Sequence, residues 1–320
     1  MHYWELVTRS FRIAWDHKYL WLIALFSGEA GGSSFNYSQR STGTTQTPAE
    51  FQQQVSTWLS DHAGLIIFLA IVWIVLIIAF FILAAICEGA TVRASAEHDS
   101  ERPFGLGMAW RAGLHTMWVI VRFRLLLIAL YLPLILILAV WFVGLMFAIV
   151  NQNRSATPVL ILTGLLLFAL WFVYAIYLFF LDRFGTRAVV LEQLMATASI
   201  ARAHRLLFKR FGRSLLVLLL AIGLAIVVAI VLACLSIIAI VPLLAGAFAA
   251  GSNSGAAAVV LVIGVLILLP IYLVVAGFLA AQGSTYWTLA FRRLDFDHAP
   301  AFAYPAAPLA PPQAPPAPQP

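Results

Sequence analysis

The sequence predicts an all-α fold: a transmembrane bundle of about six helices, with amphipathic helices at its cytoplasmic surface. Of the 320 residues, 63% are hydrophobic and only 10% are charged, whereas about 25% of the residues of a soluble domain are charged. Five runs are each apolar over the roughly 20 residues that a helix needs to cross a bilayer, and none contains Asp, Glu, Lys or Arg. The runs do not alternate polar and apolar residues as barrel strands do. A soluble enzyme and a disulfide-rich secreted scaffold are therefore excluded.

The first predicted span, residues 19–34, is the weakest, because its apolar start is followed by small polar residues and Glu29. Backbone groups in hydrocarbon must hydrogen-bond internally, so each of the other runs is expected to be a helix. Those spans are residues 63–87, 125–150, 158–181, 215–240 and 257–282. Residues 1–298 form the predicted membrane domain. Residues 299–320, rich in Pro and Ala, are expected to be a disordered cytoplasmic tail.

The placement of Lys and Arg predicts the orientation of the bundle. With six spans, every basic residue except Arg40 and Arg154 lies on one side of the membrane. Loops rich in Lys and Arg stay in the cytoplasm, so this side is predicted to be cytoplasmic, with both termini inside. Without the span at 19–34, the N-terminal basic residues would lie outside, which is the main reason for retaining that span.

The segments on the basic side resemble one another. We interpret the chain as three units, each made of a surface helix, a span out and a span back. The surface stretches are residues 10–15, 107–113 and 200–205, and the stretches after the even-numbered spans are 89–93, 185–187 and 283–285. Convergent composition at membrane flanks is the alternative. In the first surface helix, Trp4, Val7, Phe11 and Trp15 share a face that we expect to lie on the membrane.

A basic segment precedes the span at 215–240. Between residues 204 and 213, Arg and Lys alternate with Phe208 and Phe211. Cations beside an anionic leaflet contribute about 1 kcal/mol each, so this segment predicts contact with acidic headgroups, and a simple topology anchor is the alternative. The candidate headgroup contacts are Arg122, Arg124, Arg205, Lys209, Arg210 and Arg213.

A ladder of small residues runs along the span at 215–240. Ala221, Ala225, Ala229 and Ala233 are four residues apart and share one face of a helix. Small side chains let membrane helices approach closely, so we expect this face to pack against the span at 257–282.

Motifs of known chemistry are absent from the sequence. It contains no phosphate-binding loop, no metal-ligand spacing and no nucleophile elbow, so we expect no enzyme activity, no metal and no cofactor. Glu88 and Asp182, at the ends of their spans, are expected to meet Arg93 or Arg187. A membrane-embedded active site, which we expect not to exist, would draw on Glu88, Asp182, Glu192, His115 and His204.

Two cytoplasmic stretches carry a family resemblance. The first is residues 104–113 (FGLGMAWRAG), and the second includes 187–192 (RAVVLE), 200–207 (IARAHRLL) and Gly212. Both resemble the membrane domain attached to some bacterial glycerophosphoryl diester phosphodiesterases and related multi-span proteins. In that family the hydrolase is a separate soluble barrel, for which this chain has no room. The resemblance therefore implies a fold and a bacterial inner-membrane setting, and no catalytic residue.

Two functions remain open from the sequence. The first is a non-enzymatic inner-membrane protein that organises the membrane or contacts lipid or a partner through its basic amphipathic helices. The second is a permease-like transporter, or a transporter subunit, for a lipid or an apolar solute. Membrane lipids are the expected partners, acidic ones included. A protein partner or a homo-oligomer stays open, and nucleic acid is not expected, because the cations flank apolar runs.

Overall fold

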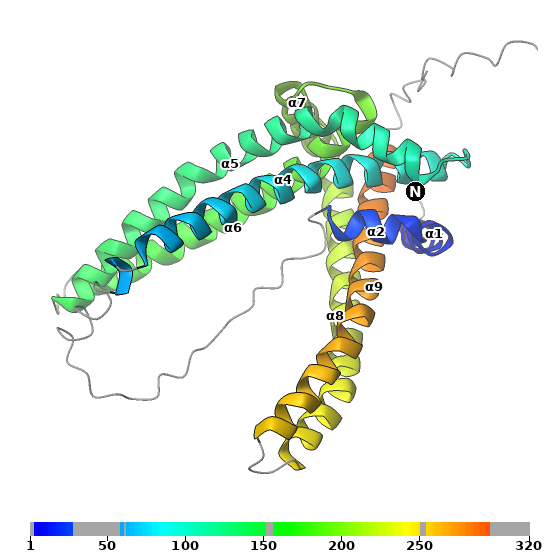
Figure 1. The fold of residues 1–320 in the computed structure, drawn as a ribbon. Helices are drawn as coiled ribbons and strands as arrows, with labels where there is room; N and C mark the ends of the chain where they lie inside the picture. Colours follow the sequence, from blue (N-terminus) through cyan, green and yellow to red (C-terminus); the bar gives the residue numbers. More distant parts are fainter. Residues whose placement is uncertain (1–2, 28–57, 61, 152–155, 250–253, 295–320) are drawn as a thin grey trace, which may run out of the picture.

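The computed structural model describes residues 3–27, 58–60, 62–151, 156–249 and 254–294, and the regular structure within them is α-helical (Figure 1). The all-α class is therefore confirmed. The helices are α1 (Tyr3–Asp16), α2 (Tyr19–Leu25), α4 (Ala63–Asp99), α5 (Leu106–Val150), α6 (Ala156–Glu192), α7 (Ala196–Lys209), α8 (Phe211–Ala249) and α9 (Ser254–Leu294).

Five of the described helices, α4, α5, α6, α8 and α9, are long and apolar enough to cross a membrane. They contain the five strong apolar runs of the sequence, and they support a multi-pass membrane protein. The helices are much longer than the runs that predicted them. The 45 residues of α5 extend about 68 Å at 1.5 Å per residue, roughly twice the ~30 Å of a hydrocarbon core. Part of each helix must therefore lie outside the lipid.

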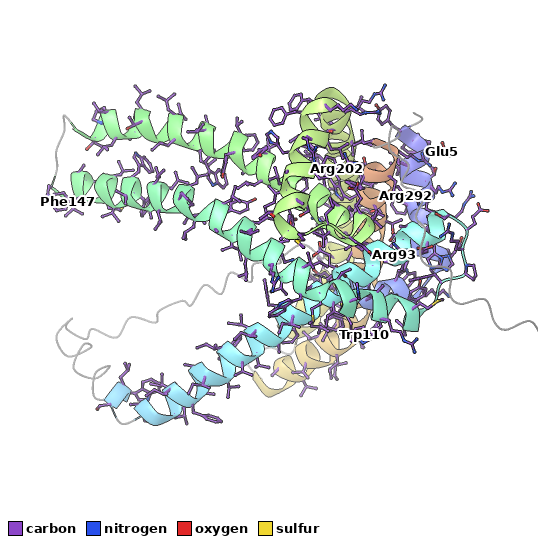
Figure 2. All side chains as sticks on the ribbon, turned by 90° about the horizontal axis from the view of Figure 1, so that it is seen from above. Glu5, Arg93, Trp110, Phe147, Arg202 and Arg292 are labelled. Atoms are coloured by element: carbon purple, nitrogen blue, oxygen red, sulfur yellow. The ribbon has the colours of Figure 1, made fainter. Side chains whose placement is uncertain are left out.

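The long helices come together as one group at one end only. Buried residues gather at 85–96 of α4, 109–127 of α5, 178–191 of α6 and 280–294 of α9, and α1, α2 and α7 pack onto the same region. We call this region the collar. Away from the collar, the apolar segments diverge: α4, α5 and α6 lean away from α8 and α9 (Figure 1), and α4 also separates from α5 and α6 (Figure 2). Their exposed side chains are mainly apolar, as expected of lipid-facing surfaces.

Glycines bring α4 and α5 into close contact in the collar. A Cβ on Gly89 would lie 2.5 Å from Oγ1 of Thr116, and one on Gly113 would overlap the backbone carbonyl of Ile86. Each helix thus presents a glycine to the other, which permits the close backbone approach typical of membrane helix pairs. The closest packing lies where both helices leave their apolar segments.

The apolar segments of α5 and α6 form a hairpin with its own polar contacts. The indole Nε1 of Trp141 donates to the carbonyl of Leu160 at 3.0 Å, and the hydroxyl of Tyr174 donates to the carbonyl of Leu130 at 3.1 Å. The ring of Trp141 lies against Gly164, where a Cβ would overlap it. Trp and Tyr are amphipathic, so they can bury their rings and still satisfy their polar atoms between two helices.

The predicted first span is not among the five candidate membrane helices. Its described part is α2, whose seven residues extend only about 10 Å. This short helix packs closely on α9, because a Cβ on Gly277 would lie 2.6 Å from the carbonyl oxygen of Trp21. Residues 28–34 and the tail 299–320 lie outside the described residues. The sixth span and the disordered tail therefore stay predictions.

The alanine ladder of α8 does not coincide with the covered face of that helix. Ala221 is half-buried, but Ala225, Ala229 and Ala233 are exposed. The half-buried residues of this stretch are Leu224, Val228 and Leu232, one position earlier on the helix. The larger side chains cover more apolar area at this surface. In the structure, the covered face of α8 is thus formed by the residues that directly precede the last three alanines and not by those alanines themselves.

Candidate functional site

The similar stretches that follow the apolar segments of α4, α6 and α9 meet at the centre of the collar. Thr91 of α4, Thr186 of α6 and Thr285 of α9 are fully buried there. Ser95 Oγ lies 2.9 Å from Thr285 Oγ1, which joins α4 to α9. The likeness noticed in the sequence therefore corresponds to a shared position in the fold. The surface stretches differ from one another: residues 10–15 and 200–205 lie in the separate helices α1 and α7, but 107–113 is continuous with its span in α5.

Two guanidinium groups are buried in this centre. Arg187 is fully buried and donates to the carbonyl of Arg183 at 3.2 Å. Arg93 is 4% exposed and forms an ion pair with Glu97, one turn along α4, at 2.7 Å. Buried charges persist only when they are paired or hydrogen-bonded. The largely apolar core of the collar therefore contains paired charges, unlike the apolar segments.

Arg124 holds three segments together at the edge of the collar. Its guanidinium pairs with the carboxylate of Glu88, which is 1% exposed, and donates to the carbonyl of Ser27 at 3.2 Å. It thereby joins α5 to α4 and to the residues after α2. Arg124, a predicted headgroup contact, is engaged inside the protein in this structure.

Asp99 anchors α1 to the end of the bundle. Its carboxylate forms ion pairs with Arg9 of α1 at 2.7 Å and with Arg292 of α9 at 2.6 Å. Asp99 is the last residue of α4, where the helix dipole disfavours a negative charge, and two cations offset that cost. Gln282 of α9 adds a hydrogen bond to the hydroxyl of the buried Ser10 at 3.2 Å.

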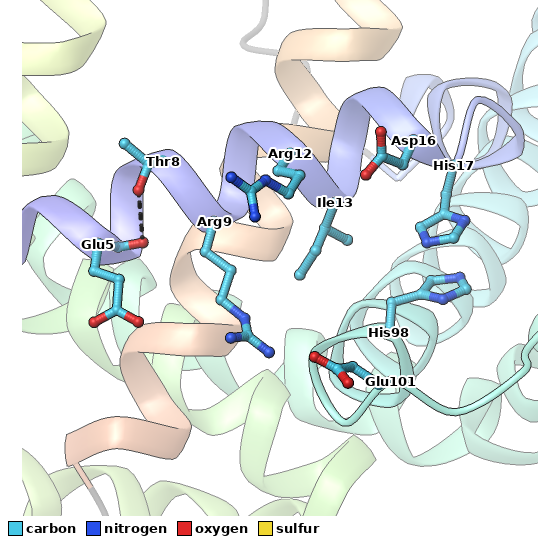
Figure 3. Close-up of a pocket in the computed structure, with 9 residues that line it drawn as sticks. All are labelled: Glu5, Thr8, Arg9, Arg12, Ile13, Asp16, His17, His98 and Glu101. Carbon is cyan, nitrogen blue, oxygen red and sulfur yellow. Dashed lines mark hydrogen bonds between the residues drawn. The ribbon is translucent and has the colours of Figure 1, made fainter.

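Beside this anchor, two histidines border a charged cavity of about 320 Å³ (Figure 3). The rings of His17 and His98 stack with centroids 3.5 Å apart, and the hydroxyl of Tyr19 lies 2.6 Å from Nε2 of His98. Burial of the ring, and then the neighbouring His17, lower the pKa of His98 to about 4. His98 therefore carries no charge at neutral pH. The cavity is lined by Glu5, Thr8, Arg9, Arg12, Ile13, Asp16, His17, His98 and Glu101.

The basic segment, residues 204–213, covers the end of α7 and the start of α8 and presents its charges outward. The inner face of α7 packs through Leu206 and Leu207, which are buried, while Arg205, Lys209 and Arg213 are exposed. Phe208 and Phe211 are also exposed, at 59% and 53%. Arg210 is half-buried, and Arg122 is exposed with its guanidinium 5.8 Å from the centre of the Trp118 ring. The segment 204–213 therefore exposes cations and aromatic rings together.

The remaining predicted residues have separate partners. Glu192 receives Arg202 through both carboxylate oxygens at 3.0–3.2 Å, which fixes the turn before α7. His204 Nδ1 lies 2.9 Å from the hydroxyl of Tyr177, which joins α7 to α6. With Glu88 on Arg124, three of the five candidates for an active site thus serve three different contacts. Among the described residues, no group of three His, Cys, Asp or Glu is placed to hold a metal.

Residues 7–290 match a family of unknown function, DUF7544. The chain belongs to this family. A comparison with curated proteins found no match, and neither did one with solved structures. The DUF7544 match covers α1 from residue 7, all of α2, α4, α5, α6, α7 and α8, and α9 as far as residue 290, so it takes in most of the collar. Nothing in these comparisons links the chain to the membrane domains of phosphodiesterases, and that resemblance stays a prediction.

Sequence reasoning missed the contacts that hold α1 in this DUF7544 fold. His17 and Tyr19 meet His98 across about 80 positions of the chain, and Arg9 meets Asp99 across 90. Periodicity reports contacts within one helix and carries no signal for such pairs. The cluster of Glu97, His98, Asp99 and Glu101 is visible in the sequence, but only the fold shows which cations it faces.

Proposed function

We propose that this DUF7544 protein is a non-enzymatic, multi-pass protein of a bacterial inner membrane whose cytoplasmic collar binds acidic phospholipid headgroups. The surface formed by α7 and the start of α8 makes the contact. The observation that carries the proposal is the exposure of Arg205, Lys209 and Arg213 beside the exposed rings of Phe208 and Phe211. The resemblance to the membrane domain attached to some glycerophosphoryl diester phosphodiesterases implies a membrane setting and adds no catalytic role.

The charge distribution supports a cytoplasmic collar. The described Arg and Lys residues belong to the collar and its attached helices, and positive charge marks the cytoplasmic side. Glu5 of α1 lies 3.6 Å from Arg293 at the end of α9, so the first and last helices share that side. Five crossings alone would separate them. We therefore retain a further crossing between residues 17 and 62, beginning with α2 against Gly277.

Both kinds of side chain on the basic surface favour an anionic membrane. Each cation near an acidic leaflet contributes about 1 kcal/mol, and aromatic rings add apolar contact at headgroup depth. The inner side of α7 is fixed by Leu206, Leu207 and the Tyr177–His204 contact. The outward cations are thus presented on a helix whose position is already set by the bundle, which reduces the entropy lost on binding.

Lipid selectivity in a mixed bilayer tests the proposal. The purified protein is reconstituted in phosphatidylcholine with a minor share of spin-labelled phosphatidylglycerol, and the motionally restricted fraction is measured. We expect enrichment of the anionic lipid, and loss of most of it in the triple variant Arg205→Gln, Lys209→Gln, Arg213→Gln. The matched control neutralises three other exposed cations of the collar, Arg12, Arg102 and Arg111. Equal enrichment in the wild type and the α7 variant would leave these residues as orientation signals only.

A permease-like role is the second candidate. The divergence of the apolar segments favours it, because α4 stands apart from the α5–α6 hairpin (Figure 2), and a lateral opening between spans is what lipid passage requires. A fluorescent-lipid scrambling assay in vesicles separates the two functions. Flipping of the labelled lipid above the rate of protein-free vesicles would select the transport role over binding alone.

A further inference from the structure

The first helix has three distinct faces around its axis. One face is buried against the bundle through Leu6, Val7, Ser10, Ile13 and Ala14. At about 100° per residue, Trp4, Phe11 and Trp15 fall within a narrow stripe beside that face, and Glu5, Arg12 and Asp16 form a parallel charged stripe. We call the first set the aromatic stripe. Val7, which the sequence placed with these aromatics, faces the bundle instead.

The aromatic stripe is exposed but uncharged. Trp4 is 71% exposed and Trp15 is 62% exposed, which leaves two large amphipathic rings on the surface of the collar. Trp is enriched where a protein meets the membrane–water boundary, because its ring is apolar and its indole N–H is polar. A single exposed Trp is ordinary on a protein surface, but two on one stripe of a helix form a continuous apolar strip.

The stripe is continuous with the lipid-facing surface of α9. The rings of Phe11, Trp15 and Trp21 lie 5.9, 5.8 and 5.4 Å from the ring of Phe278. Phe278 lies at the border of the collar, and residues 271–274 of α9, one to two turns further into the apolar segment, are exposed. Phe278 therefore joins the stripe to the exposed apolar surface of α9, a candidate membrane span.

The direction of α1 matches the plane of a bilayer. Figure 1 shows α9 upright and α1 nearly end-on, and Figure 2 shows α1 along its length, so α1 runs across α9. A bilayer crossed by α9 would thus lie parallel to α1. The anchors of α1, Arg9 on Asp99 and Ser10 on Gln282, hold it in this direction.

We infer that α1 is a membrane-surface helix whose aromatic stripe contacts the boundary between lipid headgroups and acyl chains. Its charged stripe then faces water, together with the His17–His98 cavity. This contact is apolar and independent of lipid charge, whereas the proposed contact of α7 is electrostatic. The inference goes beyond the proposed function, and either one can fail without the other.

Site-directed spin labelling tests the depth of the stripe. In a Cys234→Ser background, which removes the exposed cysteine, single labels are placed by Trp4→Cys and Trp15→Cys and, as the matched control on the charged stripe, by Arg12→Cys. The protein is reconstituted in uncharged phosphatidylcholine. We expect the ratio of accessibility to O₂ over a water-soluble nickel chelate to be several-fold higher at positions 4 and 15 than at position 12.

Each outcome decides the inference. Equal ratios at the three positions would overturn it, because the stripe would then lie in water. Loss of both accessibilities at position 4, with spin–spin broadening that grows with protein density, would also overturn it and assign the stripe to a second copy of the chain. Position 4 has the more exposed side chain, so its label gives a readout even where Trp15→Cys disturbs the contact with Phe278.

Discussion

At the scale of single residues, the collar depends on a few carboxylates that each receive cations from other helices. Asp99 receives Arg9 and Arg292, and Glu88 receives Arg124. In both cases the charge lies on α4 and its partners come from elsewhere in the chain. These pairs bridge helices, so their loss is expected to release an element as well as remove an interaction.

Asp99→Asn should loosen α1. The neutral amide leaves Arg9 and Arg292 without their shared carboxylate, and charge-assisted hydrogen bonds of this kind contribute about 1.5–3 kcal/mol. We expect faster amide hydrogen exchange in α1, with the five long helices unchanged. Asp16→Asn is the matched control, since it removes an exposed carboxylate from α1 itself. Unchanged exchange in the Asp99 variant would show that the apolar face alone fixes α1.

Arg124→Gln should destabilise the protein more than the double variant Arg124→Met, Glu88→Leu. The single change takes the guanidinium away from a carboxylate that is 1% exposed, and breaking such a buried pair costs about 3 kcal/mol or more. The double change removes both charges. Unfolding in detergent measures the difference. A single variant as stable as the wild type would mean that Arg124 acts elsewhere, for example on lipid.

Acid should weaken the contact between α1 and α4 through His98, which lies at the end of α4 beyond its apolar segment. The pKa of His98 is lowered to about 4 in the folded protein, against about 6.5 for an unperturbed histidine. The undocked state therefore binds the proton first, and stability falls as the pH drops from about 6.5 toward 4. His98→Phe keeps a ring for the stack and removes this titration. Hydrogen exchange of α1 against pH should be flatter in that variant.

At the scale of elements, hydropathy located the five long helices but not their full lengths. The apolar run at 63–87 ends where α4 enters the collar, and the helix continues through Arg93 to Asp99. Its collar half is amphiphilic and buried by neighbours that only the tertiary structure supplies. For the same reason the stretch 107–113 was expected to be a separate surface helix, although it belongs to α5.

The exposure of the basic segment could be predicted from the sequence, but the face of α8 that its neighbours cover could not. Exposure of Arg205, Lys209 and Arg213 follows from an amphipathic pattern around Leu206 and Leu207. The alanine ladder of α8 gave an equally regular pattern, yet Ala225 is exposed. A stripe of small residues permits another helix to approach closely, but it does not indicate which helix does so.

Gly164→Leu should disrupt the α5–α6 hairpin, whereas Gly144→Leu should not. A side chain at Gly164 would overlap the ring of Trp141, while nothing lies within 4 Å of a Cβ at Gly144. Both glycines are in the apolar segments of the same hairpin, so the second variant controls for hydrophobicity and for helix propensity. Overpacking typically costs about 1–3 kcal/mol. Resistance to unfolding in detergent compares the two, and equal stability would refute the contact.

At the scale of the whole molecule, the described helices combine a packed collar, which contains buried charges, with diverging apolar segments. The collar unites residues from the two ends of the chain, as the Glu5–Arg293 contact shows. This arrangement requires an even number of membrane crossings if the long helices span the bilayer.

Labelling from each side of the membrane tests this topology. In the Cys234→Ser background, Glu101→Cys in the turn between α4 and α5 should react with an impermeant maleimide only after the membrane is opened. Ser41→Cys, in the predicted outer loop, should react in intact cells. Reaction of both from the same side would contradict the proposed six crossings and the cytoplasmic placement of the collar.

The docking of α1 on α9 has a consequence for biosynthesis. The docking surface of α1 includes Phe278, Gln282 and Arg293 of α9, which are synthesised after the intervening helices. During translation the apolar face of α1 therefore has no docking surface until α9 has been synthesised. A chain that stalls before α9 would carry an unmated N-terminal helix, the sort of feature that quality-control proteases recognise.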